Sequence, residues 1–352
     1  MIEPQLINHC KGHRDTITNV AFHPTTNKIA SSSLDSSVHL WNLDGSVRCY
    51  KFSGHGDAVN CVNWSPSGDL MATASSDRTV RIWRPTVLGS SSQFYTHTSA
   101  VRYVDFSPSG SKLVTASNDK QIKLWSVANK KFISSFTGHT NWVRCARFSP
   151  NGKVIASCSD DRTFKLFDVK SGDVIESFSD SKGHAYQHCA WHPDGTLIAV
   201  GTTNNRVRIY DIRNRNLIQM YDVHTAAVNQ IDFHPSGNFM LSVSDDGTTK
   251  ILDLLEGRPI FTVKGHAKQV TAVQFSKDGK IFATGGKDNE LMIWKWDIEA
   301  KVDNASESFT NISGIQPLDE VDDTPQLDNS IIVQKTGSNF RDFDRVDFET
   351  AQ

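Results

Sequence analysis

The sequence predicts an all-β protein built from seven copies of one unit, and three observations carry this prediction. An aromatic residue recurs every 42 or 43 residues, at Phe22, Trp64, Phe106, Phe148, Trp191, Phe233 and Phe275. An apolar residue follows each of these 19 positions later, at Trp41, Trp83, Trp125, Phe167, Tyr210, Leu252 and Trp294. Within each copy, apolar and polar residues alternate with a period of two, and turns with Pro or Gly separate the alternating runs. Each copy therefore predicts four short strands.

The composition limits the class of protein further. The chain has 352 residues, of which 38% are apolar, and a formal net charge of −2, which does not favour a nucleic-acid partner. It contains no apolar run of about 18 residues and no secretory leader, so we expect a cytosolic protein without a membrane partner. The six cysteines form no CxxC pair, which indicates reduced thiols.

The end of the chain differs from the repeats. Residues 303–352 contain 11 acidic and three basic residues, and they show no sustained heptads. We therefore expect two parts, a folded domain over residues 1–298 and an acidic, flexible tail over residues 299–352.

Gly-His pairs open several copies, at 12–13, 54–55, 138–139 and 265–266, and four copies end on Trp at the second marker position. A unit of 40 to 45 residues with this pattern resembles the WD40 repeat. The resemblance implies a seven-bladed β-propeller. The seventh copy ends after Trp294 without an outermost strand, and residues 6–11 precede the first copy. We expect this N-terminal segment to complete the seventh blade and close the ring, which removes open strand edges.

The same resemblance implies a structural role for the repeated polar residues. In WD40 blades a histidine bonds to an aspartate and to a hydroxyl, and the hydroxyl receives a tryptophan N–H, so that buried polar groups are paired. The positions that match this relay are His13, Ser31, Asp35, Trp41; His55, Thr73, Asp77, Trp83; His97, Thr115, Asp119, Trp125; His139, Ser157, Asp161; His224, Ser242, Asp246; and His266, Thr284, Asp288, Trp294. Copy five has Lys182, Val200, Asn204 and Tyr210 there, so we expect its blade to be the least locked by polar bonds.

No pattern in the sequence predicts catalysis. It contains no GxxxxGK[ST] loop, no GxGxxG turn and no GxSxG elbow, so we expect no catalytic residue and no cofactor. His184, His188, Cys189 and His192 are close in sequence, but strand alternation points Cys189 away from His188 and His192. We therefore expect no metal site, and the absence of a catalytic motif favours an interaction platform.

Three positions per copy face the channel rim, by resemblance to the family, and most of them hold small or neutral side chains. Two interpretations stay open for the larger ones in copies three and four. Trp and Arg dominate binding hot spots, which favours a partner site. Alternatively, Trp142 covers a seam between blades and the arginines pair with Asp160 and other acids. The candidate partner-binding residues are Arg102, Asn118, Trp142, Arg144, Asp160, Asp245 and Lys287.

Basic residues also recur after the relay acid in copies two to five, and we assign them to outer strands. Either they solvate the blade edges, or they form a stripe for an acidic polymer such as tubulin tails or RNA. These residues are Arg78, Arg81, Lys120, Lys123, Arg162, Lys165, Arg206 and Arg208.

Several stretches are more specific than the generic repeat and together resemble the proteome-of-centriole protein one family. They are residues 11–15, 141–146, 226–229, 233–238 and 251–258, the last with Leu252-Asp253 in place of Trp-Asp. The resemblance implies a scaffold of centrioles and basal bodies that supports centriole assembly and stability and cilium formation. It implies centriolar protein partners and a location at the centrosome and cytoskeleton. The alternatives are a substrate receptor of a ubiquitin ligase and a chromatin-complex scaffold.

Overall fold

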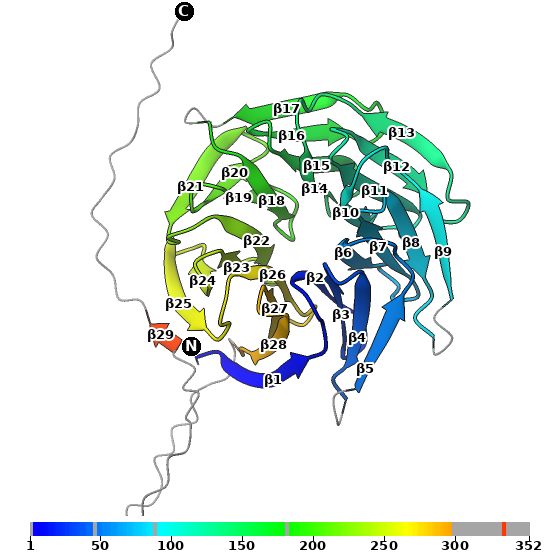
Figure 1. Ribbon diagram of the computed structural model, residues 1–352. Helices are drawn as coiled ribbons and strands as arrows, with labels where there is room; N and C mark the ends of the chain where they lie inside the picture. The colour runs from blue at the N-terminus through cyan, green and yellow to red at the C-terminus, as the bar shows by residue number, and fades with distance from the viewer. Residues whose placement is uncertain (1–2, 45–47, 87–89, 180–182, 298–332, 336–352) are drawn as a thin grey trace, which may run out of the picture.

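The computed structural model describes residues 3–44, 48–86, 90–179, 183–297 and 333–335. All regular elements of this part are strands, and they form seven antiparallel sheets arranged as blades around a central axis (Figure 1). The predicted seven-bladed propeller is therefore confirmed. The predicted tail, residues 299–352, lies outside the described residues except for 333–335.

Within a blade the strands follow the chain from the axis outwards. Blades one to three contain β2 (Ile17–Phe22), β3 (Lys28–Ser33), β4 (Ser37–Asn42) and β5 (Arg48–Ser53); β6 (Val59–Trp64), β7 (Met71–Ser75), β8 (Thr79–Trp83) and β9 (Ser91–Tyr95); and β10 (Val101–Phe106), β11 (Lys112–Ser117), β12 (Ile122–Ser126) and β13 (Phe132–Phe136). Blades four and five contain β14 (Val143–Phe148), β15 (Val154–Ser159), β16 (Thr163–Asp168) and β17 (Val174–Ser179); and β18 (Tyr186–Trp191), β19 (Leu197–Thr202), β20 (Arg206–Asp211) and β21 (Asn216–Asp222).

Blades six and seven depart from this simple order. Blade six contains β22 (Val228–Phe233), β23 (Phe239–Ser244), β24 (Thr248–Asp253) and β25 (Arg258–Lys264), and β29 (Val333–Lys335) pairs with the outer edge of β25. Blade seven contains β26 (Val270–Phe275), β27 (Ile281–Gly286) and β28 (Glu290–Lys295), and β1 (Gln5–Lys11) supplies its fourth strand. Figure 1 shows β1 along the outer edge of β28. The expected closure of the ring by the N-terminal segment is confirmed.

The core lies between neighbouring blades, where apolar side chains of the inner strands are fully buried. The repeated aromatic at the end of each inner strand takes part in these seams. The Trp64 indole N–H donates to the Ala21 carbonyl of the preceding blade at 3.0 Å, and that of Trp191 donates to the Arg147 carbonyl at 3.2 Å. These indoles join adjacent blades by polar bonds as well as by apolar contact.

Three histidines make a second kind of contact between blades, which the sequence did not reveal. The Nε2 atoms of His23, His192 and His234 lie 3.2, 3.0 and 3.2 Å from the carbonyl oxygens of Gly68, Gly237 and Gly279 in the next blade. Each of these glycines has a positive φ, and a Cβ there would lie within about 2.5 Å of the imidazole. Glycine is therefore required both by the turn and by the close approach of the ring.

Candidate functional site: the mouth of the central channel

Seven β-bulges build the mouth of the channel. In every innermost strand the pairing register shifts between the first and the third residue, so the second residue has no opposite neighbour. A bulge re-aims the side chain of the extra residue. All seven bulge residues line one cavity of about 370 Å³: Thr18, Asn60, Arg102, Arg144, Gln187, Asn229 and Thr271.

Blade four contributes the most prominent group of the mouth. Arg144 Nε and Nη2 donate to the two carboxylate oxygens of Asp160 at 2.8 and 2.6 Å. The guanidinium carbon lies 5.4 Å from the Trp142 ring centroid, and the Trp142 carbonyl accepts the Asp160 N–H at 2.9 Å. A bidentate ion pair and a cation–π contact therefore fix Arg144 in one position. Trp142 stays 43% exposed, so its outer face is free to meet a partner.

Blade three places a second arginine beside the first. Arg102 Nε donates to the Asn118 side-chain oxygen at 2.9 Å, and no described carboxylate forms an ion pair with Arg102. Burial and the charge of Arg144 lower the pKa of Arg102, while the charge of Asp160 opposes this. Asp160 is the acidic partner of Arg144 alone, so this side of the mouth has an excess of positive charge.

The opposite side of the mouth is balanced. Asp245 accepts a hydrogen bond from Asn229 Nδ2 at 2.9 Å and lies 3.6 Å from Lys287 Nζ. The seven predicted partner-binding residues thus fall into two groups, one on blades three and four and one on blades six and seven. Arg102, Arg144 and Lys287 line the cavity itself. Arg144 pairs with Asp160, as the structural alternative to partner binding predicts. Trp142 is exposed, as a partner-binding site requires.

The wall below the mouth holds polar residues that the sequence did not single out. Tyr103, His188 and Gln230 follow the bulge residues and also line the cavity. His188 is 4% exposed, and neither of its ring nitrogens has a hydrogen-bond partner among the described residues. A β-bulge cannot be predicted from a single sequence. The sequence therefore did not predict that Tyr103, His188 and Gln230, the third residues of their strands, line the channel.

Deeper in the channel, Arg147 lies near two partly buried carboxylates, Asp105 and Asp232. Arg147 Nη1 is 3.8 Å from Asp232 Oδ1. Burial raises the pKa of Asp232 to about 6, and the Arg147 charge limits the rise. Asp105 accepts hydrogen bonds from Asn63 Nδ2 at 2.7 Å and from the Phe148 N–H at 2.9 Å. These groups form a network that is satisfied within the protein.

The relay residues lie inside the blades and not in the mouth. In blade two, His55 Nδ1 lies 2.8 Å from Asp77, His55 Nε2 lies 2.7 Å from Thr73 Oγ1, and the Trp83 N–H donates to the same hydroxyl at 2.9 Å. Burial raises the pKa of Asp77, but hydrogen bonds from His55 and Thr79 outweigh it and hold the pKa well below its usual range. The same set of bonds occurs in blades one, three and seven, and the His, Asp and hydroxyl bonds occur in blades four and six.

Blade five replaces the relay by aromatic contact. The Tyr186 and Tyr210 hydroxyls lie 3.2 Å apart, and the Tyr210 ring lies 4.9 Å from that of Phe178. Val200 is fully buried at the position of the relay hydroxyl. The expected position of Lys182 lies outside the described residues.

The recurring basic residues do not lie on outer strands, so that assignment was wrong. Arg78, Lys120 and Arg162 occupy turns with φ between 68° and 71°. The others lie on third strands, where several bond to the neighbouring outer strand: Lys165 Nζ donates to Ser177 at 2.8 Å, and Arg81 donates to Ser91 at 3.1 Å. Arg81 and Lys165 therefore extend outwards from a covered third strand and bind side chains of their own blade.

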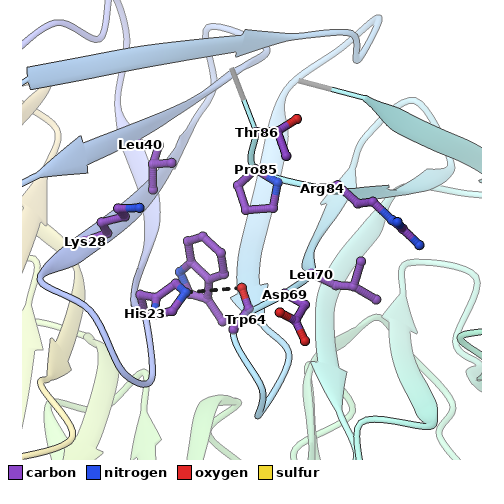
Figure 2. Close-up of a pocket in the computed structure, with 10 residues that line it drawn as sticks. His23, Lys28, Leu40, Trp64, Asp69, Leu70, Arg84, Pro85 and Thr86 are labelled. Carbon is purple, nitrogen blue, oxygen red and sulfur yellow. Dashed lines mark hydrogen bonds between the residues drawn. The ribbon is translucent and has the colours of Figure 1, made fainter. Parts of the chain in front are cut away.

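A larger hollow of about 660 Å³ lies between blades one and two. Figure 2 shows its side chains, with the His23 imidazole bonded to the Gly68 carbonyl and Lys28 and Arg84 on opposite sides. The His23 ring meets Trp64 edge-on at 4.6 Å. This hollow therefore lies in the interface between blades one and two, where His23 binds Gly68 and packs on Trp64.

No candidate chemistry appears elsewhere in the part of the chain that the structure describes. There, no group of three His, Cys, Asp or Glu side chains is placed to hold a metal ion. The same residues include no helix with the length and apolarity needed to cross a membrane.

The fold and the relay define a WD-repeat β-propeller, a class that generally mediates protein interactions without catalysis. Comparison with known families agrees. Residues 95–294 match the model described as "Nucleolar protein 10-like, N-terminal domain", and residues 4–42 and 45–84 match "WD domain, G-beta repeat". Since the first model covers more than half of the chain, the chain belongs to this family of propeller domains.

Individual relatives match shorter stretches. Pre-mRNA-processing factor 19 of Bos taurus is 31% identical over 117 residues, which are 32% of this chain and 23% of that protein. Guanine nucleotide-binding protein subunit beta-5b of Danio rerio is 30% identical over 30% of this chain and 27% of its own length. Denticleless protein homolog A of Xenopus laevis is 33% identical over 28% of this chain and 14% of its own length. The chain thus spans less than a third of the length of each.

Proposed function

We propose that this protein is a non-catalytic scaffold that binds partner proteins at the channel mouth and acts at centrioles or basal bodies. The observation that carries the binding site is Trp142, a large side chain that is 43% exposed and held over an ion-paired Arg144. A rigid aromatic and an arginine at the centre of a polar rim have the character of a binding hot spot. The centriolar part rests on the resemblance of residues 11–15, 141–146 and 251–258 to the centriolar family.

A second candidate is a subunit of a nuclear complex. It is favoured by the names of two matches, a nucleolar protein and a pre-mRNA-processing factor. Both candidates use the propeller as an interaction module, so the fold does not separate them. Microscopy of the full chain with a fluorescent tag does: paired spots beside a centriole marker support the first candidate, and nuclear or nucleolar signal refutes it in favour of the second.

The binding site is tested separately by proximity labelling in dividing cells with the wild type, Trp142→Ala and Leu255→Ala. Leu255 is a matched control because it is also a large exposed apolar residue, but it lies in the turn between β24 and β25 of blade six and not beside Arg144. We expect Trp142→Ala to lose a set of neighbours that the wild type and Leu255→Ala retain. Equal neighbour sets for all three folded proteins would show that Trp142 is not part of the site.

A further inference from the structure

We propose that the channel mouth binds a carboxylate side chain of the partner protein, between Arg102 and Arg144. This inference rests on the proposed function of the mouth as a protein-binding site. It identifies the chemical group that the partner presents there.

The first support is the arrangement of the two arginines. They occupy the bulge positions of adjacent inner strands, β10 and β14, and both line the same cavity. Like charges that lie side by side in a partly buried site repel each other unless an anion stands between them. Asp160 binds Arg144 through both oxygens, whereas Arg102 has only the neutral Asn118 as its partner.

The second support is the count of charges around the mouth. Arg102, Arg144 and Lys287 face Asp160 and Asp245, so three positive groups meet two negative ones. The excess of one positive charge matches a carboxylate, which carries one negative charge. A phosphoryl group carries nearly two at neutral pH and would be left with one unpaired. The deeper carboxylates, Asp105 and Asp232, lie three residues further along their strands, which is about 10 Å.

The third support is the polar wall beneath the arginines. His188 has two ring nitrogens without a hydrogen-bond partner among the described residues, although it is 96% buried. The His188 ring lines the cavity beside the Cys145 thiol, so it adds a polar side chain to this wall. Gln187 adds a neutral amide to the same cavity, whereas the amide nitrogens of Asn60 and Asn229 already donate within the protein.

The test uses the full chain and four pools of eleven-residue peptides. Every pool has random flanking residues and one fixed central residue: Glu, Gln, Lys or phosphoserine. The protein is immobilised, and the retained fraction of each pool is measured. We expect the Glu pool to be retained at least ten-fold more than the Gln pool, and the Lys pool least. Arg102→Gln should bring the Glu and Gln pools to equal retention.

Arg48→Gln is the matched control, because Arg48 is an exposed arginine on the outer strand β5. It should keep the preference for Glu, and thermal melting checks that both variants are folded. Asp160→Asn adds one uncompensated positive charge, so it should shift the preference towards phosphoserine. Equal retention of Glu and Gln by the wild type would overturn the proposal, as would a wild-type preference for phosphoserine that depends on Arg102.

This outcome can be separated from a failure of the proposed function. If Trp142→Ala loses its neighbours in cells while Glu and Gln peptides bind alike, the mouth is a protein-binding site and only the carboxylate assignment fails. If Trp142→Ala keeps all of its neighbours, the proposed function of the mouth fails independently of the peptide result.

Discussion

The Thr73 hydroxyl lies 2.7 Å from His55 Nε2 and also accepts the Trp83 indole N–H at 2.9 Å. The Thr73 oxygen thus forms hydrogen bonds with two buried rings, the His55 imidazole and the Trp83 indole. The geometry assigns the protons: the His55 Nδ1–H donates to Asp77, so Nε2 accepts the threonine proton. Blade two depends on this hydroxyl for the pairing of both rings.

We expect Thr73→Val to lower the free energy of unfolding by about 3 kcal/mol. Valine has nearly the same shape but leaves the His55 and Trp83 nitrogens unpaired, at about 1–3 kcal/mol each. Urea unfolding followed by tryptophan fluorescence measures the change. The control is Thr225→Val at an exposed position, which should change stability by less than about 0.5 kcal/mol. Equal losses for the two variants would mean that the relay hydroxyl does not matter for stability.

His39 makes blade one sensitive to acid. It is 3% exposed, stacks on His13 at 3.8 Å between ring centroids, and has no hydrogen-bond partner among the described residues. Burial, helped by the charge of His13, lowers the pKa of His39 to about 4. Between this value and the ordinary pKa of about 6.5, the unfolded chain binds more protons than the folded one. Stability is therefore complete above pH 6.5 and falls as the pH drops towards 4.

Replacing His39 by Met, the residue that blade seven carries at the same register in Met292, should remove this dependence. From pH 7.5 to pH 5.0 we expect the wild type to lose about 2 kcal/mol more than His39→Met. Denaturant unfolding at both pH values gives the difference. Parallel losses in the two proteins would show that His39 is protonated alike in the folded and unfolded states.

The closure of the ring depends on one face of β1. Cys10 is buried against blade seven, whereas Ile7 on the same strand is 44% exposed. A glutamate at position 10 would bring an unpaired charge into the seam, so we expect Cys10→Glu to cost more than about 3 kcal/mol and Ile7→Glu less than about 1 kcal/mol.

A freed β28 edge also invites pairing with other molecules. Light scattering should therefore detect oligomers of Cys10→Glu but not of Ile7→Glu. If both variants stay monomeric and equally stable, β1 does not hold the ring closed.

The contact between His234 and Gly279 is tight enough to be tested with a single methyl group. An added Cβ at Gly279 would lie 2.1 Å from His234 Nε2, while at Gly172 it would meet nothing within 4 Å. Both glycines have a positive φ, so alanine costs about 1 kcal/mol of backbone strain at either site. We expect Gly279→Ala to cost about 1–3 kcal/mol more than Gly172→Ala, because the buried ring must move. Similar melting temperatures for the two variants would argue against this contact.

Much of the fold could be predicted from the sequence because the same pattern of residues occurs in seven copies. The 42-residue period gives the number of blades, and the alternation within each copy gives the strands. The resemblance to the WD40 repeat implied that His55, Thr73 and Asp77 form one network, and the structure contains these bonds. The missing outer strand of copy seven predicted the role of β1.

The site could be predicted only in part. Arg102, Trp142 and Arg144 were selected from their positions in the repeat, but two interpretations of them stayed open. The structure shows that Arg144 on β14 does bind Asp160 while Trp142 stays exposed, and this combination depends on how the start of β14 packs beside the turn that holds Asp160. The sequence also did not predict that Lys165 lies on the third strand of its blade. Strands two, three and four of a blade have a similar alternation of apolar and polar residues, so they are hard to distinguish.

The sequence by itself therefore determined the number of blades, their strands, the relay inside them and the strand that closes the ring. These features are local or periodic, and hydrophobic alternation and buried hydrogen bonding fix them within a single copy. The resemblance to the WD40 family had placed three positions per copy at the channel rim, and only the tertiary structure decided how these residues pair there. A β-bulge in every inner strand turns Arg102 and Arg144 towards one cavity, and the closed ring then brings residues from seven distant copies together.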